Sequence, residues 1–176
     1  MIRKNSCVLF GLMFVAGLTA GAGAGAPAVD AAGAFERLKA LQGTWESPRP
    51  GGQAATTRFE LVANGTVLME HYSNPELPGG GHMVSAYHLD GATLVLTHYC
   101  IARNQPTLRA DRFDAATGEI QFEFLRGMNM PTENTGHMRR ALYRLDDANH
   151  FTTAWEFFRE GKRTMTELET FTRTGK

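Results

Sequence analysis

The sequence contains only two cysteines, Cys7 and Cys100, in 176 residues. A small scaffold held by several disulfides is therefore excluded, and the fold must be stabilised by its own apolar core. Hydrophobic residues make up 43% of the chain, and a chain of this length can bury a core of one domain. The same apolar content, with no net charge, excludes a disordered chain.

The sequence also lacks an excess of charge of either sign. Eighteen Lys and Arg residues balance eighteen Asp and Glu residues, and the two signs are interspersed along the chain. A protein that binds nucleic acid through a basic surface needs a surplus of positive charge. We therefore expect no nucleic-acid partner.

A long hydrophobic run is missing as well. The longest apolar stretch, residues 8–18, is shorter than the roughly 20 residues that a transmembrane helix needs. Arg3 and Lys4 precede it, and small residues with A-x-A cleavage sites near Ala24–Ala26 follow it, as in a secretory signal peptide. We expect residues 1–26 to be cleaved on export to the periplasm or beyond, leaving no stable membrane span. A retained membrane anchor is the alternative.

Cleavage near Ala26 would change the composition of the chain. Removing Arg3 and Lys4 from the eighteen basic residues leaves sixteen against eighteen acidic ones. Cys7 would be lost too, so Cys100 would be a lone thiol without an internal disulfide. The mature domain, residues 33–174, is expected to be slightly acidic.

After one predicted helix at residues 34–41, the apolar residues alternate with period two, which is typical of strands. Asn64-Gly65 and Asp90-Gly91 are strong hairpin signals between such segments. Ten short strands joined by tight turns predict an all-β, antiparallel up-and-down barrel, because closure removes exposed edges. The expected strands are 44–47, 57–63, 66–72, 82–89, 92–100, 107–113, 119–125, 138–145, 151–159 and 163–173.

The Asp90-Gly91 hairpin has one face with larger apolar side chains. We expect this face to point into the barrel, because burying it removes more apolar surface from water. His98 and Cys100 would then lie side by side in the interior, with Met83 across from His98. The expected inward residues are Met83, Ser85, Tyr87, Leu89, Leu94, Leu96, His98 and Cys100.

The final hairpin pairs across Glu160-Gly161 and has two contrasting faces. Burying a charged face would cost several kcal/mol per ion unless the charges pair, so we expect that face to be wet. The aromatic and threonine face would line a partly hydrated cavity. The charged face holds Glu156, Arg163, Glu167 and Glu169, and the inward face holds Phe151, Thr153, Trp155, Phe157, Thr164, Thr166, Leu168 and Thr170.

Gly43-Thr-Trp45 follows the predicted helix and opens the first predicted strand. This arrangement resembles the calycin superfamily of lipocalins, fatty-acid-binding proteins and nitrobindin-like barrels, including exported bacterial lipocalin-like proteins. In lipocalins the tryptophan closes the barrel base and an arginine of the last strand packs over it. The resemblance implies these structural roles for Gly43, Trp45 and Arg173. The predicted alternation puts Arg173 on the charged face, so this contact requires a bulge or a late turn.

The resemblance also implies a ligand, because these families mostly bind small apolar molecules and include few enzymes. Nitrobindin-like barrels carry a glycine-rich stretch after the tryptophan, whereas Trp45 is followed here by Glu-Ser-Pro-Arg-Pro-Gly-Gly. We therefore expect no cofactor, with haem as an open alternative.

The inward faces and the resemblance together predict an interior pocket for a small, mostly apolar molecule. Removal of apolar surface from water would drive binding, and His98 and Tyr87 would orient the ligand. The expected lining is Tyr87, Leu94, Leu96, His98, Cys100, Phe122, Phe124 and Trp155.

Two other functions stay open. The first is a small enzyme, an isomerase or hydrolase, that uses His98 as general base, with Cys100 as a weaker catalytic candidate. The second is a structural envelope protein with a filled core. The remaining histidines lack metal-binding spacing, so we expect no metal site, and no nucleotide or hydrolase motif occurs. The sequence carries no indication of oligomeric state.

Overall fold

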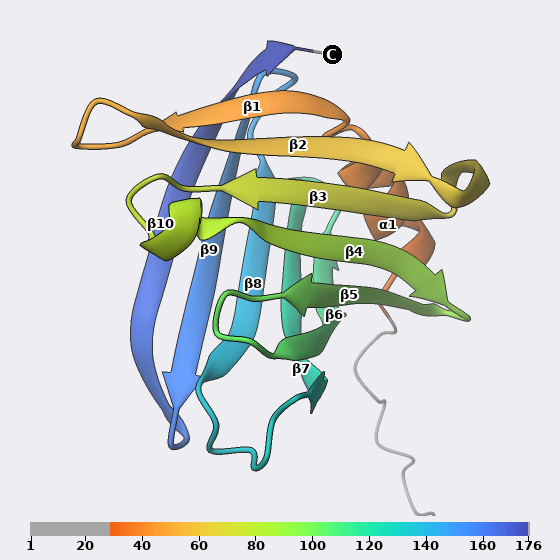
Figure 1. Cartoon of the computed structure of the whole chain (residues 1–176). Coiled ribbons are helices and arrows are strands. Elements are labelled where there is room, and N and C mark those ends of the chain that lie inside the picture. Colours follow the sequence, from red (N-terminus) through yellow and green to blue (C-terminus); the bar gives the residue numbers. More distant parts are fainter. Residues whose placement is uncertain (1–28, 176) are drawn as a thin grey trace, which may run out of the picture.

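The computed structural model describes residues 29–175, so the predicted signal segment and its cleavage site lie outside the described residues. The chain forms a closed antiparallel barrel of ten strands, each paired with the next along the chain. The first and last strands pair with one another and complete the closure (Figure 1). This confirms the predicted up-and-down barrel with one short helix.

The barrel consists of one helix, two short 3-10 turns and ten strands. In chain order these are α1 (Ala31–Lys39), β1 (Gly43–Pro48), β2 (Ala54–Val62), η1 (Ala63–Gly65), β3 (Val67–Ser73), η2 (Pro78–Gly81), β4 (Met83–Asp90), β5 (Thr93–Tyr99), β6 (Gln105–Asp114), β7 (Glu119–Met128), β8 (His137–Leu145), β9 (His150–Arg159) and β10 (Lys162–Gly175).

Helix α1 lies at the end of the barrel where the β2–β3 and β4–β5 turns are found (Figure 1). Its first turn is capped by the Asp30 carboxylate, which accepts a hydrogen bond from the Gly33 N–H at 2.9 Å. Phe35 and Leu38 are buried and join the core. We call this the closed end of the barrel, and the end that holds the β1–β2, β3–β4 and β5–β6 connections the open end.

Trp45 is the centre of the closed end. Its side chain is 1% exposed, its indole N–H donates to the Leu41 carbonyl at 2.7 Å, and its ring packs edge-on against Phe151 at 4.8 Å. Gly43 has a φ of 118°, a conformation that side-chain-bearing residues rarely adopt, at the point where the chain enters β1. The helix, this turn and β1 are thereby joined to one aromatic cluster.

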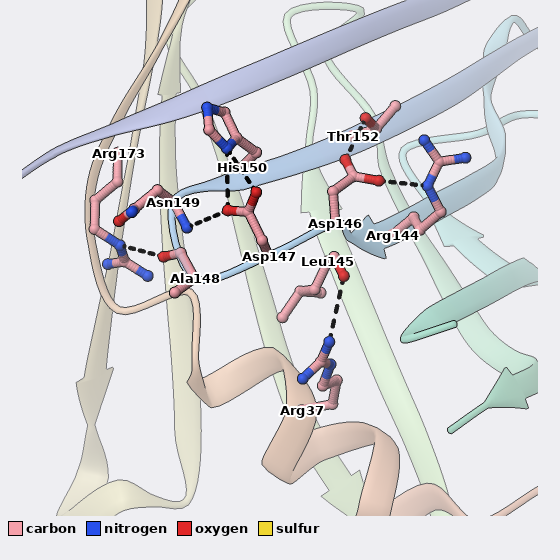
Figure 2. Close-up of polar contacts among 10 residues, drawn as sticks. All are labelled: Arg37, Arg144, Leu145, Asp146, Asp147, Ala148, Asn149, His150, Thr152 and Arg173. Carbon is pink, nitrogen blue, oxygen red and sulfur yellow. Dashed lines mark hydrogen bonds and ion pairs between the residues drawn. The ribbon is translucent and has the colours of Figure 1, made fainter. Parts of the chain in front are cut away.

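Arg173 in β10 covers Trp45 from outside. Its guanidinium carbon lies 3.9 Å from the ring centroid, and its nitrogens donate to the carbonyls of Ala40, Gln42 and Ala148 at 2.6–2.9 Å. Figure 2 shows the contact with Ala148 and a similar one from Arg37 of α1 to Leu145 at the end of β8. The arginines therefore tie α1, β10 and the β8–β9 connection together.

The β4–β5 hairpin has the predicted inward face but a shifted register. Asp90 pairs with Thr93, so the turn is centred one residue later than expected, on Gly91 and Ala92. Ser85 therefore lies across from His98, and the predicted position of Met83 opposite His98 is wrong. Leu89, expected inside, is exposed at the end of β4. A register shift of two residues preserves which face is inward, so the rest of the face is buried as predicted except for Cys100, which is half-buried.

The β9–β10 hairpin does not keep its predicted faces. The register shifts between Arg163 and Met165, which leaves Thr164 as an extra residue in β10 and pairs Trp155 with Glu167. Every later residue of β10 is thereby turned over, and Glu169 is buried while Leu168 is 68% exposed. The prediction that Thr164, Thr166, Leu168 and Thr170 face inward, and that Glu167 and Glu169 face water, is wrong. The same bulge brings Arg173 to Trp45.

Large side chains fill the closed end and the middle of the barrel. Phe151 stacks on Phe171 at 4.8 Å, and Tyr87, Phe122 and Tyr143 meet edge to face beyond them. Close packing of this kind leaves little space for a ligand there. Space inside the barrel is found toward the open end.

Candidate functional site

A small polar chamber lies inside the barrel between the packed middle and the open end. Its volume is about 30 Å³, and about 10–15 Å³ of such volume holds one water, so it has room for about two waters. Three carboxyl side chains and one histidine line this chamber, although it lies in the barrel interior, where apolar side chains predominate. The lining is Glu70, Tyr72, Met83, Ser85, His98, Met138, Thr153, Trp155, Glu167, Glu169 and Phe171.

Glu70 of β3 lies at the floor of the chamber and is 5% exposed. Tyr87 and Tyr143 donate to its Oε2 at 2.5 and 2.9 Å, and Thr57 donates to Oε1 at 3.2 Å. Burial raises the pKa of Glu70, and these hydrogen bonds, with one from Ser85, oppose the rise. Burial and the neighbouring Glu70 charge hold the pKa of both tyrosines well above the usual value.

His98 of β5 forms one wall of the chamber. Its Nδ1 lies 3.0 Å from Ser85 Oγ, and its ring packs at 4.8 Å from the Trp155 ring. A hydroxyl both donates and accepts, so this contact with Ser85 fits either neutral tautomer of His98. Nε2 is buried without a partner in the described residues. Burial lowers the pKa of His98 to about 4, which keeps the imidazole neutral near pH 7.

The roof of the chamber is an ion-pair cluster. Arg49, which follows β1, contacts the carboxylates of both Glu167 and Glu169 and lies 3.0 Å from the Tyr72 hydroxyl. Tyr72 also donates to Glu169 at 3.0 Å. Burial and the Glu167 charge raise the pKa of Tyr72 to about 12, so the phenol stays protonated. Two acids and one base carry a net negative charge at this position.

An apolar cup lies outside the roof and opens at the mouth of the barrel. Its volume is about 620 Å³, within the range of small-molecule sites. Met165 and Leu168 on its rim are 44% and 68% exposed, so the cup is open to solvent. Cup and chamber share Met83, Met138 and Glu167 and therefore adjoin. The other cup residues are Arg49, Leu77, Cys100, Ile101, Ala102, Phe157 and Thr166.

The predicted pocket residues are divided among five places. Tyr87 contacts Glu70 beneath the chamber, while Leu94, Leu96 and Phe122 are buried in the packed middle. His98 and Trp155 line the chamber, and Cys100 lines the cup. Phe124 packs against His137 at 4.6 Å and lines neither hollow. The structure therefore brings together His98 and Trp155 but not the whole predicted set.

Cys100 does not form a catalytic pair with His98. The His98 ring faces Ser85, and within residues 29–175 no hydrogen bond joins its nitrogens to the Cys100 thiol. Burial raises the pKa of this thiol, which disfavours the nucleophilic thiolate. Cys100 is therefore a small lining residue of the cup.

The most polar part of the site was not predicted from the sequence. Glu70 had a detectable signal, because it alternates with Leu68 and Tyr72 on one face of a strand where Leu68 is buried. Glu167 and Glu169 had none, since the bulge that turns them inward has no marker in the sequence. Arg49 follows the last residue of β1, so the period-two alternation of strand residues does not predict where its side chain lies.

No protein-family model matches this chain, and no curated protein is similar to it. The closed ten-stranded antiparallel barrel is compatible with a calycin-like fold. None of the helices in the described part of the chain is long and apolar enough to cross a membrane. Among residues 29–175, no group of three or more His, Cys, Asp or Glu side chains is arranged to hold a metal ion.

Proposed function

We propose that this protein binds a small amphipathic molecule, with its apolar part in the cup and its polar end directed at the chamber. The observation that carries the proposal is the adjacency of a solvent-open apolar cup and a buried polar chamber. Burial of apolar surface in the cup would supply most of the affinity, and the polar groups would select the ligand. The binding position is nearer the mouth than the sequence predicted.

We also propose a structural class for this protein and its location in the cell. The Gly43-x-Trp45 turn covered by Arg173 supports assignment to the calycin barrels, which mostly bind small apolar molecules. The charged, apolar and small-residue layout of residues 1–26 supports export. We therefore propose an exported carrier or sensor of a small molecule.

Binding is better supported than catalysis. A general base works best with a pKa near the working pH, and burial holds the pKa of His98 at about 4. Such an imidazole is a weak base, although its neutral form is a good hydrogen-bond acceptor. The chamber residues are therefore suited to recognising a polar group rather than to removing a proton from carbon.

Filling the cup tests the proposal. Ala102 is exposed and lines the cup, so Ala102→Trp would occupy the space without changing the barrel core. Ala115, in the β6–β7 turn at the closed end, is also exposed, and Ala115→Trp is the matched control. We expect octanol to bind the wild type and Ala115→Trp in isothermal titration calorimetry, and Ala102→Trp to lose at least tenfold in affinity. Equal affinity in both variants would refute the cup as the site, and a wild type that binds no octyl compound would favour a structural role.

A further inference from the structure

We infer that the polar end of the ligand is an organic cation, a primary ammonium group, bound by Glu167 at the wall shared by the cup and the chamber. This inference rests on the proposed function and adds the chemical class of the ligand. Four observations carry it: the charges of the two hollows, the free oxygen of Glu167, the buried His98 nitrogen without a partner and the apolar cup.

The charged side chains that line the two hollows are mostly acidic. Glu70, Glu167 and Glu169 are acids, and Arg49 is the single cationic side chain among the described lining residues, since His98 is neutral near pH 7. Even with Glu70 neutral, two carboxylates face one guanidinium, so the cluster has one uncompensated negative charge. In a partly buried position this charge is screened less than at the surface. A carboxylate or phosphate ligand would be repelled there, and Arg49 is already held by both acids.

Glu167 has the oxygen that such a cation would contact. Arg49 and Tyr72 both contact its Oε1, at 3.2 and 3.4 Å, which leaves Oε2 without a hydrogen-bond partner among the described residues. The side chain is 19% exposed and lines both hollows. An ammonium group in the cup therefore has an accessible carboxylate oxygen in the lining.

His98 provides an independent indication of a ligand with a polar end. It is 4% exposed, lines the chamber below the ion-pair cluster, and its Nε2 has no partner in the described residues. A buried polar atom without a partner costs about 1–3 kcal/mol, and a ligand group that hydrogen-bonds to it removes that cost. The Arg49 Nη2 and Tyr72 hydroxyl donors already point at carboxylates, while Arg49 Nε is buried without a partner in the described residues.

The rest of the ligand is defined by the cup. Methionine, phenylalanine, leucine and isoleucine side chains surround its space, and methionines adapt to varied apolar shapes. An alkyl or aryl amine of about the size of octylamine fits a hollow of about 620 Å³. An inorganic cation would leave this apolar surface exposed to water.

A series of three probes with the same chain separates charge from apolar binding. Octylamine is a cation at pH 7, octanol is neutral and octanoate is an anion. We expect titration calorimetry on the wild-type protein, with Trp155 fluorescence as a second readout, to give octylamine at least tenfold higher affinity than octanoate, with octanol between them. Removing one charge-assisted hydrogen bond corresponds to roughly a tenfold change in affinity or more.

Glu167→Gln keeps the shape of the side chain and removes its charge. We expect this variant to bind octylamine roughly tenfold more weakly and octanol within about twofold of the wild type. Glu36→Gln, on an exposed residue of α1 at the closed end, makes the same change in net charge and should leave all three affinities unchanged. Arg49→Gln should have the opposite effect and strengthen octylamine binding relative to octanol.

The outcomes separate this inference from the proposed function. Octanoate binding as tightly as octylamine would overturn the cation and leave the apolar site standing. A Glu36→Gln variant that loses octylamine as Glu167→Gln does would also overturn it, because the preference would then follow net charge alone. Failure of all three probes would instead contradict the proposed function itself.

Discussion

Arg173 and Arg49 lie at opposite ends of the same barrel and are held in different ways. At the closed end, Arg173 donates to three backbone carbonyls and covers the Trp45 ring. At the open end, Arg49 contacts the carboxylates of Glu167 and Glu169, and its Nε has no partner in the described residues. One arginine is fixed by the backbone, whereas the other is held by side chains that can change partners.

This difference separates the two tasks of the barrel. Backbone carbonyls are positioned by the secondary structure, so contacts with them fix how α1, β1 and β10 meet. Carboxylates and hydroxyls of side chains can be shared with a ligand that enters from the cup. We therefore expect the closed end to determine stability and the open end to determine recognition.

The largest expected effect is at Trp45. Trp45→Ala removes a ring that is 1% exposed, its contact with Phe151 and the surface that Arg173 covers. Truncation of a buried aromatic side chain costs about 3–5 kcal/mol of unfolding free energy. Urea unfolding followed by circular dichroism would measure this loss.

Leu168→Ala at the open end is the control for this prediction. The side chain is 68% exposed, so its removal should change the unfolding free energy by less than about 0.5 kcal/mol. If Trp45→Ala and Leu168→Ala cost the same, the closed end is not the stabilising end and the comparison fails.

The barrel was predictable because hairpin signals and period-two alternation act locally. In β4–β5 the turn is displaced by one residue, yet the inward face is the predicted one, since a register change of two residues preserves parity. In β9–β10 a single extra residue, Thr164, reverses the parity of β10. Bulges depend on how strands close around a barrel, which local alternation does not encode.

The candidate site was predictable only where it follows alternation. His98 and Trp155 lie on inward faces that the sequence indicates, and both line the chamber. Glu169 was expected to face water because burying an unpaired charge is expensive. The structure offsets that cost with Arg49 and Tyr72, which come from segments distant in the sequence. Such pairing is a property of the closed barrel rather than of any one segment.

The second prediction concerns His98 at the open end. Burial lowers its pKa from 6.5 to about 4, so between these values the unfolded chain binds a proton that the folded chain does not. The unfolding free energy therefore decreases as the pH falls from about 6.5 toward 4, and His98 accounts for about 3 kcal/mol of this decrease. Glu70, whose pKa is raised by burial, acts in the opposite direction and is present in both proteins compared.

Urea unfolding of the wild type and His98→Gln at several pH values would isolate this contribution. We expect the wild type to lose about 3 kcal/mol more than His98→Gln between pH 7 and pH 4. His82→Gln, at an exposed position in the β3–β4 connection, is the control and should keep most of the wild-type slope. Equal pH slopes for the wild type and His98→Gln would show that the chamber does not exclude the charged imidazole.

The smallest expected effect is Arg173→Lys, which keeps the charge at the closed end and removes the planar fork. A lysine ammonium cannot reach the carbonyls of Ala40, Gln42 and Ala148 together. The loss of these contacts should cost about 1–2 kcal/mol in urea unfolding, against less than about 0.5 kcal/mol for Arg112→Lys on the exposed surface of β6. Both variants keep the positive charge. If Arg173→Lys cost no more than Arg112→Lys, Arg173 would act through its charge and not through its three hydrogen bonds to backbone carbonyls. Arg173 and Arg49 would then differ only in their position in the barrel.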